Sequence, residues 1–322
     1  MTLHVKDLLP GDLLLSPPPP LTHGWAGQAI VLLTKGTTSH AAIYYGIVDD
    51  VPQIVHSYLD GVVFLELKKH FEQDATPHCI VRRHTPAVDL TAVLKAAKTY
   101  ANQDNPLPKY AFGVLAVVIL AKKLSEKKLH SREFFDFTVL FCNLMVSLFK
   151  ISDTQRHQLN RMHCSQLVAK CYADAGLKIN FNNLILDYQG EGLLPGSKSL
   201  SDFIRKAQDN QQLIKSEPTL PPIDAAGENR IVSSFFEMME RGDNEKTEDS
   251  VSDAELLNIG LYLAQLTSVV DLLSQPKSSQ QPENLTAAYP NPFLDRYYYI
   301  LPDDLLYNTQ DFIKIGKICD AD

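Results

Sequence analysis

Cysteine is scarce in this sequence and irregularly placed. The 322 residues contain five cysteines, an odd number. No two of them have the spacing of a zinc-binding motif, and nothing in their placement suggests a disulfide scaffold. A chain of this kind fits a reducing compartment, where thiols persist. The cysteines are Cys79, Cys142, Cys164, Cys171 and Cys319.

Positive charge is also in short supply. The formal net charge is −8, and no run or stripe of lysine and arginine occurs. Proteins that bind nucleic acid need basic side chains to neutralise phosphates. We therefore expect no nucleic acid among the partners of this chain.

No apolar run is long enough to span a membrane, which needs about 20 residues. The run 111–121 is apolar but short, and the stretch 134–149 is interrupted by Asp136, Asn143 and Ser147. We expect two helices here, either buried or lying against a hydrophobic surface, which leaves open a peripheral contact with a membrane. Residues 1–15 lack the basic-then-apolar pattern of a signal peptide. The expected location is the cytoplasm, or export without a cleavable signal peptide.

A helix that begins at Cys164 is the first candidate for chemistry. Apolar residues recur at helical spacing from this cysteine onward, and Gly176 follows as a stop. A thiol at a helix start lies near unpaired backbone N–H groups, which favour the nucleophilic thiolate and could hold an oxyanion. His163 is adjacent in sequence but points elsewhere on a helix, so we expect the base to come from another element.

Two histidines on neighbouring strands are better candidates for that base. The expected strands are 39–48 and 53–58, joined by a hairpin near Val48. His40 would then lie roughly opposite His56 on one face, about 5 Å apart at Cβ. We predict that His40 takes the proton of Cys164 and that His56 orients His40 and fixes its tautomer. Further strands are expected at 62–67 and 78–83, and a further helix at 89–102.

Four segments together resemble a known family. They are Gly11-Asp12-Leu13, Thr38-Ser39-His40-Ala41-Ala42-Ile43-Tyr44, Val55-His56-Ser57 with Gly61-Val62, and His163-Cys164-Ser165-Gln166-Leu167-Val168. In this order they resemble the YiiX/YaeF-like permuted papain-fold amidases, circularly permuted relatives of the NlpC-type cell-wall peptidases that lie near the lecithin–retinol acyltransferase group.

The resemblance implies Cys164 as nucleophile, His40 as base and His56 as the third, polar member. It also implies that Ser165 helps to hold a substrate, and that no cofactor is needed. The segment Leu301-Pro302-Asp303-Asp304-Leu305 resembles the family's closing segment, with Asp303 where glycine is usual.

The expected fold is α+β, a circularly permuted papain-like (NlpC-type) fold. An antiparallel sheet would pack on the nucleophile helix, and helical insertions would surround it. Residues 1–184 would form the catalytic domain, with 111–155 as a helical insertion. Residues 185–297 would be a largely helical accessory region, suited to a protein partner, and 298–322 would close the catalytic domain.

The expected function is a cysteine hydrolase that acts on an amide or peptide bond through a thiol acyl-enzyme. One alternative is a lipid acyl hydrolase or acyltransferase with the same triad. Another is an inactive papain-like scaffold that serves protein interactions. A metal hydrolase ranks below these, because no His, Asp or Glu residues have ligand spacing along the sequence.

Overall fold

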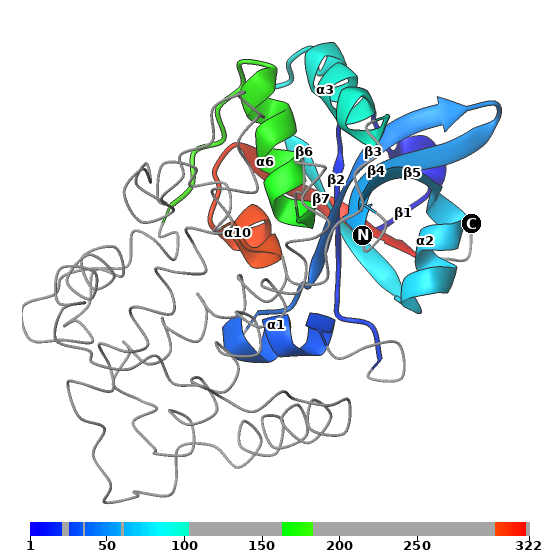
Figure 1. Cartoon of the computed structure of the whole chain (residues 1–322), viewed down its shortest axis with the longest axis vertical. Coiled ribbons are helices and arrows are strands. Elements are labelled where there is room, and N and C mark those ends of the chain that lie inside the picture. Colours follow the sequence, from blue (N-terminus) through cyan, green and yellow to red (C-terminus); the bar gives the residue numbers. More distant parts are fainter. Residues whose placement is uncertain (21–25, 35, 59–60, 103–162, 183–299, 320–322) are drawn as a thin grey trace, which may run out of the picture. The chain divides into compact units, whose positions relative to one another are not determined.

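The computed structural model describes residues 1–20, 26–34, 36–58, 61–102, 163–182 and 300–319 (Figure 1). The chain divides into two compact units. The first comprises Met1–Ala111, Asn160–Leu184 and Tyr297–Asp322, and the second comprises Phe112–Leu159 and Ile185–Arg296. The described residues belong to the first unit. The expectations for 111–155 and 185–297 concern residues outside them and stay predictions.

A seven-stranded sheet forms the centre of the first unit, in the order β1-β7-β6-β2-β3-β4-β5. Neighbouring strands are antiparallel except for β1 and β7, which are parallel. The sheet is therefore mixed, which corrects the expectation of a purely antiparallel one. These two strands come from opposite ends of the chain, so no tight turn imposes an antiparallel direction on them. The strands are β1 (Thr2–Leu3), β2 (Leu13–Ser16), β3 (His40–Val48), β4 (Val51–Tyr58), β5 (Gly61–Glu66), β6 (His78–His84) and β7 (Phe312–Cys319).

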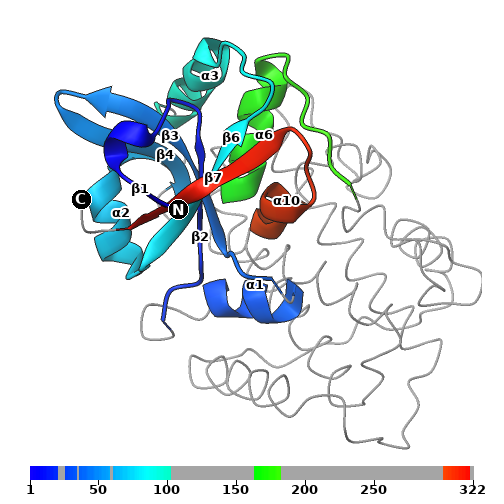
Figure 2. The ribbon, with the colours of Figure 1, turned by 180° about the vertical axis from the view of Figure 1, so that it is seen from behind.

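Helices cover both faces of this sheet. On one face α6 (Cys164–Asp174) packs against β3 and β4 and lies beside α3 (Thr91–Ala101) (Figures 1 and 2). On the other face α2 (Leu67–Asp74) packs against β4 and β5. The remaining helices are the 3-10 turn η1 (Val5–Asp7), α1 (Ala26–Thr34) and α10 (Pro302–Tyr307). In the described part of the chain, no helix has the length and apolarity needed to cross a membrane.

Strand alternation divides the core into two apolar clusters. Alternate side chains of β2 and β3, including Leu13, Ala41 and Ile43, pack with α6 and α3. The intervening ones, including Leu14 and Ala42, pack with α2. We call these two sides the α6 face and the α2 face.

The strands lie close to where the sequence predicts them. The predicted strand 39–48 is β3, and those at 53–58, 62–67 and 78–83 fall within two residues of β4, β5 and β6. The predicted helix 89–102 is α3; its N-cap residue is Leu90, and Asp89 before it accepts the N–H of Thr91 at 2.9 Å. The sequence interpretation missed α2 and the short helix α10.

Candidate active site

A capping box fixes the start of α6 at Cys164. The N-cap residue His163 has an extended backbone, and its Nδ1 accepts the N–H of Gln166 at 3.3 Å. In return Gln166 Oε1 accepts the N–H of His163, also at 3.3 Å. His163 Nδ1 therefore serves the cap of the helix.

Burial dominates the environment of the thiol. Cys164 is 3% exposed. Burial raises the pKa of the Cys164 thiol, while hydrogen bonds from the backbone N–H groups of Ala41, Ser165 and Cys164 itself act in the opposite direction. The expectation that the helix start favours a thiolate is therefore outweighed by desolvation, which penalises the charged form. Nucleophilic chemistry at this thiol calls for a base.

The thiol lies beside the strand that carries His40. The backbone N–H of Ala41, the next residue along β3, donates toward the Cys164 sulfur. Successive backbone N–H groups of a strand point to alternate neighbours within the plane of the sheet. The N–H of Tyr44 donates to Asp12, on the β2 side. The N–H of Ser39, just before β3, also donates to β2, at Ser16, so this alternation is not regular at the entry of the strand where Ala41 lies.

The ladder between β3 and β4 ends near this point. Its last pair is Ala42 with His56. The Cys164 thiol belongs to the cluster of the α6 face and contacts the residue that follows His40 on β3.

A β-bulge puts His56 on the same face as His40. The hairpin starts with Val48 opposite Val51 and runs regularly to Gly46 opposite Gln53. Continued unchanged, that register would put His56 opposite Ile43, which belongs to the α6 face. The bulge between Tyr44 and Gly46 shifts the pairing by one, so that His56 lies opposite Ala42 instead.

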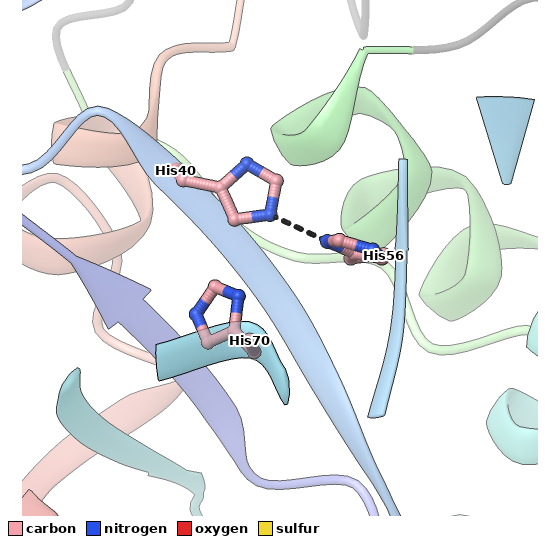
Figure 3. A group of neighbouring side chains, drawn as sticks. All are labelled: His40, His56 and His70. Carbon is pink, nitrogen blue, oxygen red and sulfur yellow. Dashed lines mark hydrogen bonds between the residues drawn. The ribbon is translucent and has the colours of Figure 1, made fainter. Parts of the chain in front are cut away.

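The two rings then meet diagonally. His40 is two residues from the partner of His56, rather than directly opposite it as the sequence suggested. Diagonal neighbours are still within reach of large side chains. His40 Nε2 lies 3.1 Å from His56 Nδ1, and both residues are buried (Figure 3). The contact predicted between the two histidines is therefore present.

A third histidine, which the sequence interpretation missed, joins this pair. His70 on α2 is buried, and its Nε2 lies 2.9 Å from Ser16 Oγ on β2. Its ring centroid is 5.6 Å from that of His40 and 5.9 Å from that of His56. Leu67, His70 and Phe71 have helical i, i+3, i+4 spacing, and this signal could have revealed both the helix and its buried face.

These histidines form a group with metal-ligand potential. One ring nitrogen from each of His40, His56 and His70 lies within 4.8 Å of the others. The members come from β3, β4 and α2, so no spacing along the sequence announces the group. Among the described residues it is the one such group of three or more histidine, cysteine or acidic side chains.

Ser165 lies in a structural network. Its hydroxyl donates to the carbonyl oxygen of Ile300 at 2.7 Å and lies 3.2 Å from His163 Nδ1. The side chain is buried and ties α6 to the C-terminal segment. Contact between Ser165 and a substrate stays a prediction.

Comparison with known proteins gives little further guidance. No family model matches this chain, and no curated protein matches it. Among solved structures, a similar one is the crystal structure of metalloprotein YiiX from Escherichia coli O157:H7. The two are 15% identical, the alignment covers 55% of this chain and 72% of that chain, and the TM-score is 0.34. At that level the likeness is distant and carries no argument about the site.

Proposed function

We propose that this chain is a cysteine hydrolase or acyltransferase that attacks a carbonyl with Cys164, on a circularly permuted papain-like fold. The bond attacked is a peptide or other amide, or an acyl ester of a lipid. One observation carries the proposal: the Cys164 sulfur takes the Ala41 N–H at the strand end where His40 contacts His56. This places the proposed nucleophile one residue along β3 from the proposed base, His40.

The tautomers follow from that contact. His40 Nε2 faces His56 Nδ1 at 3.1 Å, so in the proposed reaction His40 Nδ1 takes the thiol proton. To act as base His40 must carry its hydrogen on Nε2 and donate it to His56 Nδ1. His56 thereby fixes the tautomer and stabilises the imidazolium that forms.

The reaction begins with transfer of the Cys164 proton to His40 Nδ1, while sulfur bonds to the carbonyl carbon. The carbonyl oxygen becomes an oxyanion, for which the backbone N–H groups at the start of α6 are donors. His40 returns the proton to the leaving amine or alcohol as its bond to carbon breaks, and a thioester remains. Water or an acceptor nucleophile, deprotonated by His40, then releases the acyl group and restores the thiol.

Chain order supports the permuted fold. In papain-type proteins the cysteine helix precedes the histidine strand, whereas here His40 and His56 precede Cys164. The C-terminal strand β7 returns to the sheet between β1 and β6. The two ends of the chain are therefore neighbours in one sheet, as a permutation of the chain requires.

Labelling with a small electrophilic thiol probe tests the proposal. A chloroacetamide should modify Cys164 faster than Cys79, Cys171 and Cys319, and the label should vanish in Cys164→Ala. Cys171→Ala is the matched control, because Cys171 is a buried thiol of the same helix. Slow labelling spread evenly over the cysteines would overturn the proposal, as would unchanged Cys164 labelling in His40→Ala.

A further inference from the structure

The three-histidine group has the dimensions of a metal site. An imidazole bound to Zn²⁺ has a metal–nitrogen distance of about 2.0–2.1 Å, which puts three tetrahedrally arranged ring centroids roughly 5 Å apart. The centroids here are 5.2, 5.6 and 5.9 Å apart. The ring nitrogens lie within 4.8 Å of one another, against about 3.3 Å around one tetrahedral ion, so binding requires the rings to move closer together.

The ring nitrogens are directed accordingly. His40 Nε2 and His56 Nδ1 are 3.1 Å apart, close to the separation of two nitrogens on one tetrahedral ion. His70 has Nε2 against Ser16 Oγ, and its other nitrogen, Nδ1, points toward the His40–His56 pair (Figure 3). A ligating histidine usually makes a hydrogen bond with its other ring nitrogen, which orients the ring. Ser16 supplies that partner.

The donor set selects the kind of ion. Three neutral imidazoles suit Zn²⁺, Cu²⁺, Ni²⁺ and Fe²⁺, whereas Ca²⁺ and Mg²⁺ prefer oxygen ligands. All three histidines are buried, with His70 fully so. Removing an ion from such a place requires the side chains to move, which slows its release.

We propose that His40, His56 and His70 bind a divalent first-row transition ion of the Zn²⁺ type, and that the ion switches off the thiol reaction. Binding at His40 Nε2 moves the ring hydrogen to Nδ1, the nitrogen that must accept the Cys164 proton. His56 Nδ1 is occupied as well, so it no longer accepts a hydrogen bond from His40. The inhibitory part rests on the proposed function, and the binding part does not.

Metal binding is tested on the purified full-length chain after chelator treatment. Zn²⁺ is titrated in competition with a chromophoric chelator, and Co²⁺ is added separately to record its visible spectrum. We expect one tight ion per chain in the wild type and in the control His78→Gln, which removes a partly exposed histidine of β6 outside the group. In His70→Leu affinity should fall at least 100-fold, since loss of an outer partner alone costs 10–100-fold.

Two results would overturn the site. The first is that the wild type does not bind one Zn²⁺ per chain tightly. The second is that the wild type and His70→Leu bind Zn²⁺ with equal affinity. If His70→Leu does not fold by circular dichroism, His70→Gln replaces it as a polar variant that keeps a partner for Ser16. The Co²⁺ spectrum of the wild type then decides independently, because three imidazoles on tetrahedral Co²⁺ give strong visible bands without a thiolate charge-transfer band.

Inhibition is measured as the ratio of Cys164 labelling rates with and without saturating Zn²⁺, so that each variant is its own reference. The ratio should fall at least tenfold in the wild type and in His78→Gln, and stay near one in the His70 variant at the same Zn²⁺ concentration. An equal ratio in all three would overturn the inhibitory role. If Cys164 does not label selectively even without metal, the proposed function fails and takes the inhibitory role with it, while the binding data still decide the site.

Discussion

The two faces of the sheet differ in chemistry although the same strands build them. The α6 face is lined largely by apolar side chains and carries the thiols of Cys164, at the helix start, and of the buried Cys171. The α2 face carries His40, His56 and His70 at the same end of the sheet. Neither face holds a nucleophile together with a base. The link between the two sets is strand β3, where Ala41 donates to Cys164 and the preceding residue is His40, so the proposed site joins the two faces through this strand.

The largest effect is expected when the proposed nucleophile of the α6 face is removed. Cys164→Ala should abolish covalent labelling and turnover. The free energy of unfolding should change by only about 1 kcal/mol, an ordinary cost for one substitution. Intact-mass spectrometry and a urea melt measure the two effects.

Cys171→Ala separates a reactive thiol from a structural one. This variant should lose at least as much free energy of unfolding as Cys164→Ala, because Cys171 is fully buried further along the helix. It should still be labelled at Cys164. A large loss of stability in Cys164→Ala with no loss of turnover would make Cys164 a core residue.

Removing the base from the α2 face should have the next largest effect. General-base catalysis is worth about 10²–10⁴-fold, so His40→Ala should reduce kcat by that range. His56→Gln should leave a measurable remainder, since His56 acts only through its 3.1 Å contact with His40. Single-turnover rates on a thioester or amide substrate give both numbers. Equal losses in the two variants would contradict this division of roles.

Much of this arrangement could be predicted from the sequence, and the failures have physical causes. Strand β3 and helix α6 were predictable because alternation and helical spacing are local patterns. His70 was missed because a short helix between two strands is a weak local signal. The raised pKa of Cys164 was not foreseen because helix-start effects are local, whereas burial depends on the whole fold.

The β-bulge is the instructive case. A regular two-residue hairpin would have put His40 and His56 on opposite faces, so the predicted contact was correct only because of an irregularity that the sequence interpretation did not include. Gly46 marks it, with a backbone φ of 120°, in a region that other residues rarely adopt.

Gly46→Ala therefore tests whether the bulge joins the two faces. The backbone strain should cost about 1–3 kcal/mol of stability. If the strand relieves that strain by shifting register, His56 turns away from His40 and Cys164 labelling should slow at least tenfold. Gly176→Ala is the matched control, because Gly176 also has positive φ, at 76°, with no atom within 4 Å of the added Cβ. Equal labelling rates in the two variants would separate the bulge from reactivity.

Alkaline pH should lower the free energy of unfolding through two buried groups of the α6 face, Cys171 and Tyr172. Burial, together with Asp174, raises the pKa of Cys171, and burial, then Asp12 and Cys171, raises that of Tyr172. Unfolding returns both groups to ordinary values of about 8.5 and 10, so above these the unfolded chain binds fewer protons and the free energy of unfolding falls as pH rises. Urea melts between pH 7 and pH 10 should show this fall, with a smaller slope in Cys171→Ala. Identical slopes in both proteins would contradict the assignment.

The smallest effect is expected where the C-terminal segment holds the entry of β3 without belonging to either face. Asp303, at the start of α10, accepts the N–H of Thr37 at 2.9 Å and the hydroxyl of Thr38 at 2.7 Å. These residues lead directly into His40, so the carboxylate limits the motion of the strand end at which the two faces meet. In Asp303→Asn one side-chain oxygen is replaced by an NH₂ group, which cannot accept from the Thr37 and Thr38 donors. The free energy of unfolding should therefore fall by about 1 kcal/mol. We expect kcat to fall two- to fivefold with little change in Zn²⁺ affinity, because the bound ion itself holds the three histidines in position.

The control is Asp311→Asn. The Asp311 carboxylate accepts a comparable hydrogen bond, from the N–H of Asn180 at 2.6 Å, but Asn180 is far from His40 along the chain. If both variants lose stability but only Asp303→Asn loses kcat, the entry loop positions the base; equal kcat values would confine Asp303 to stability.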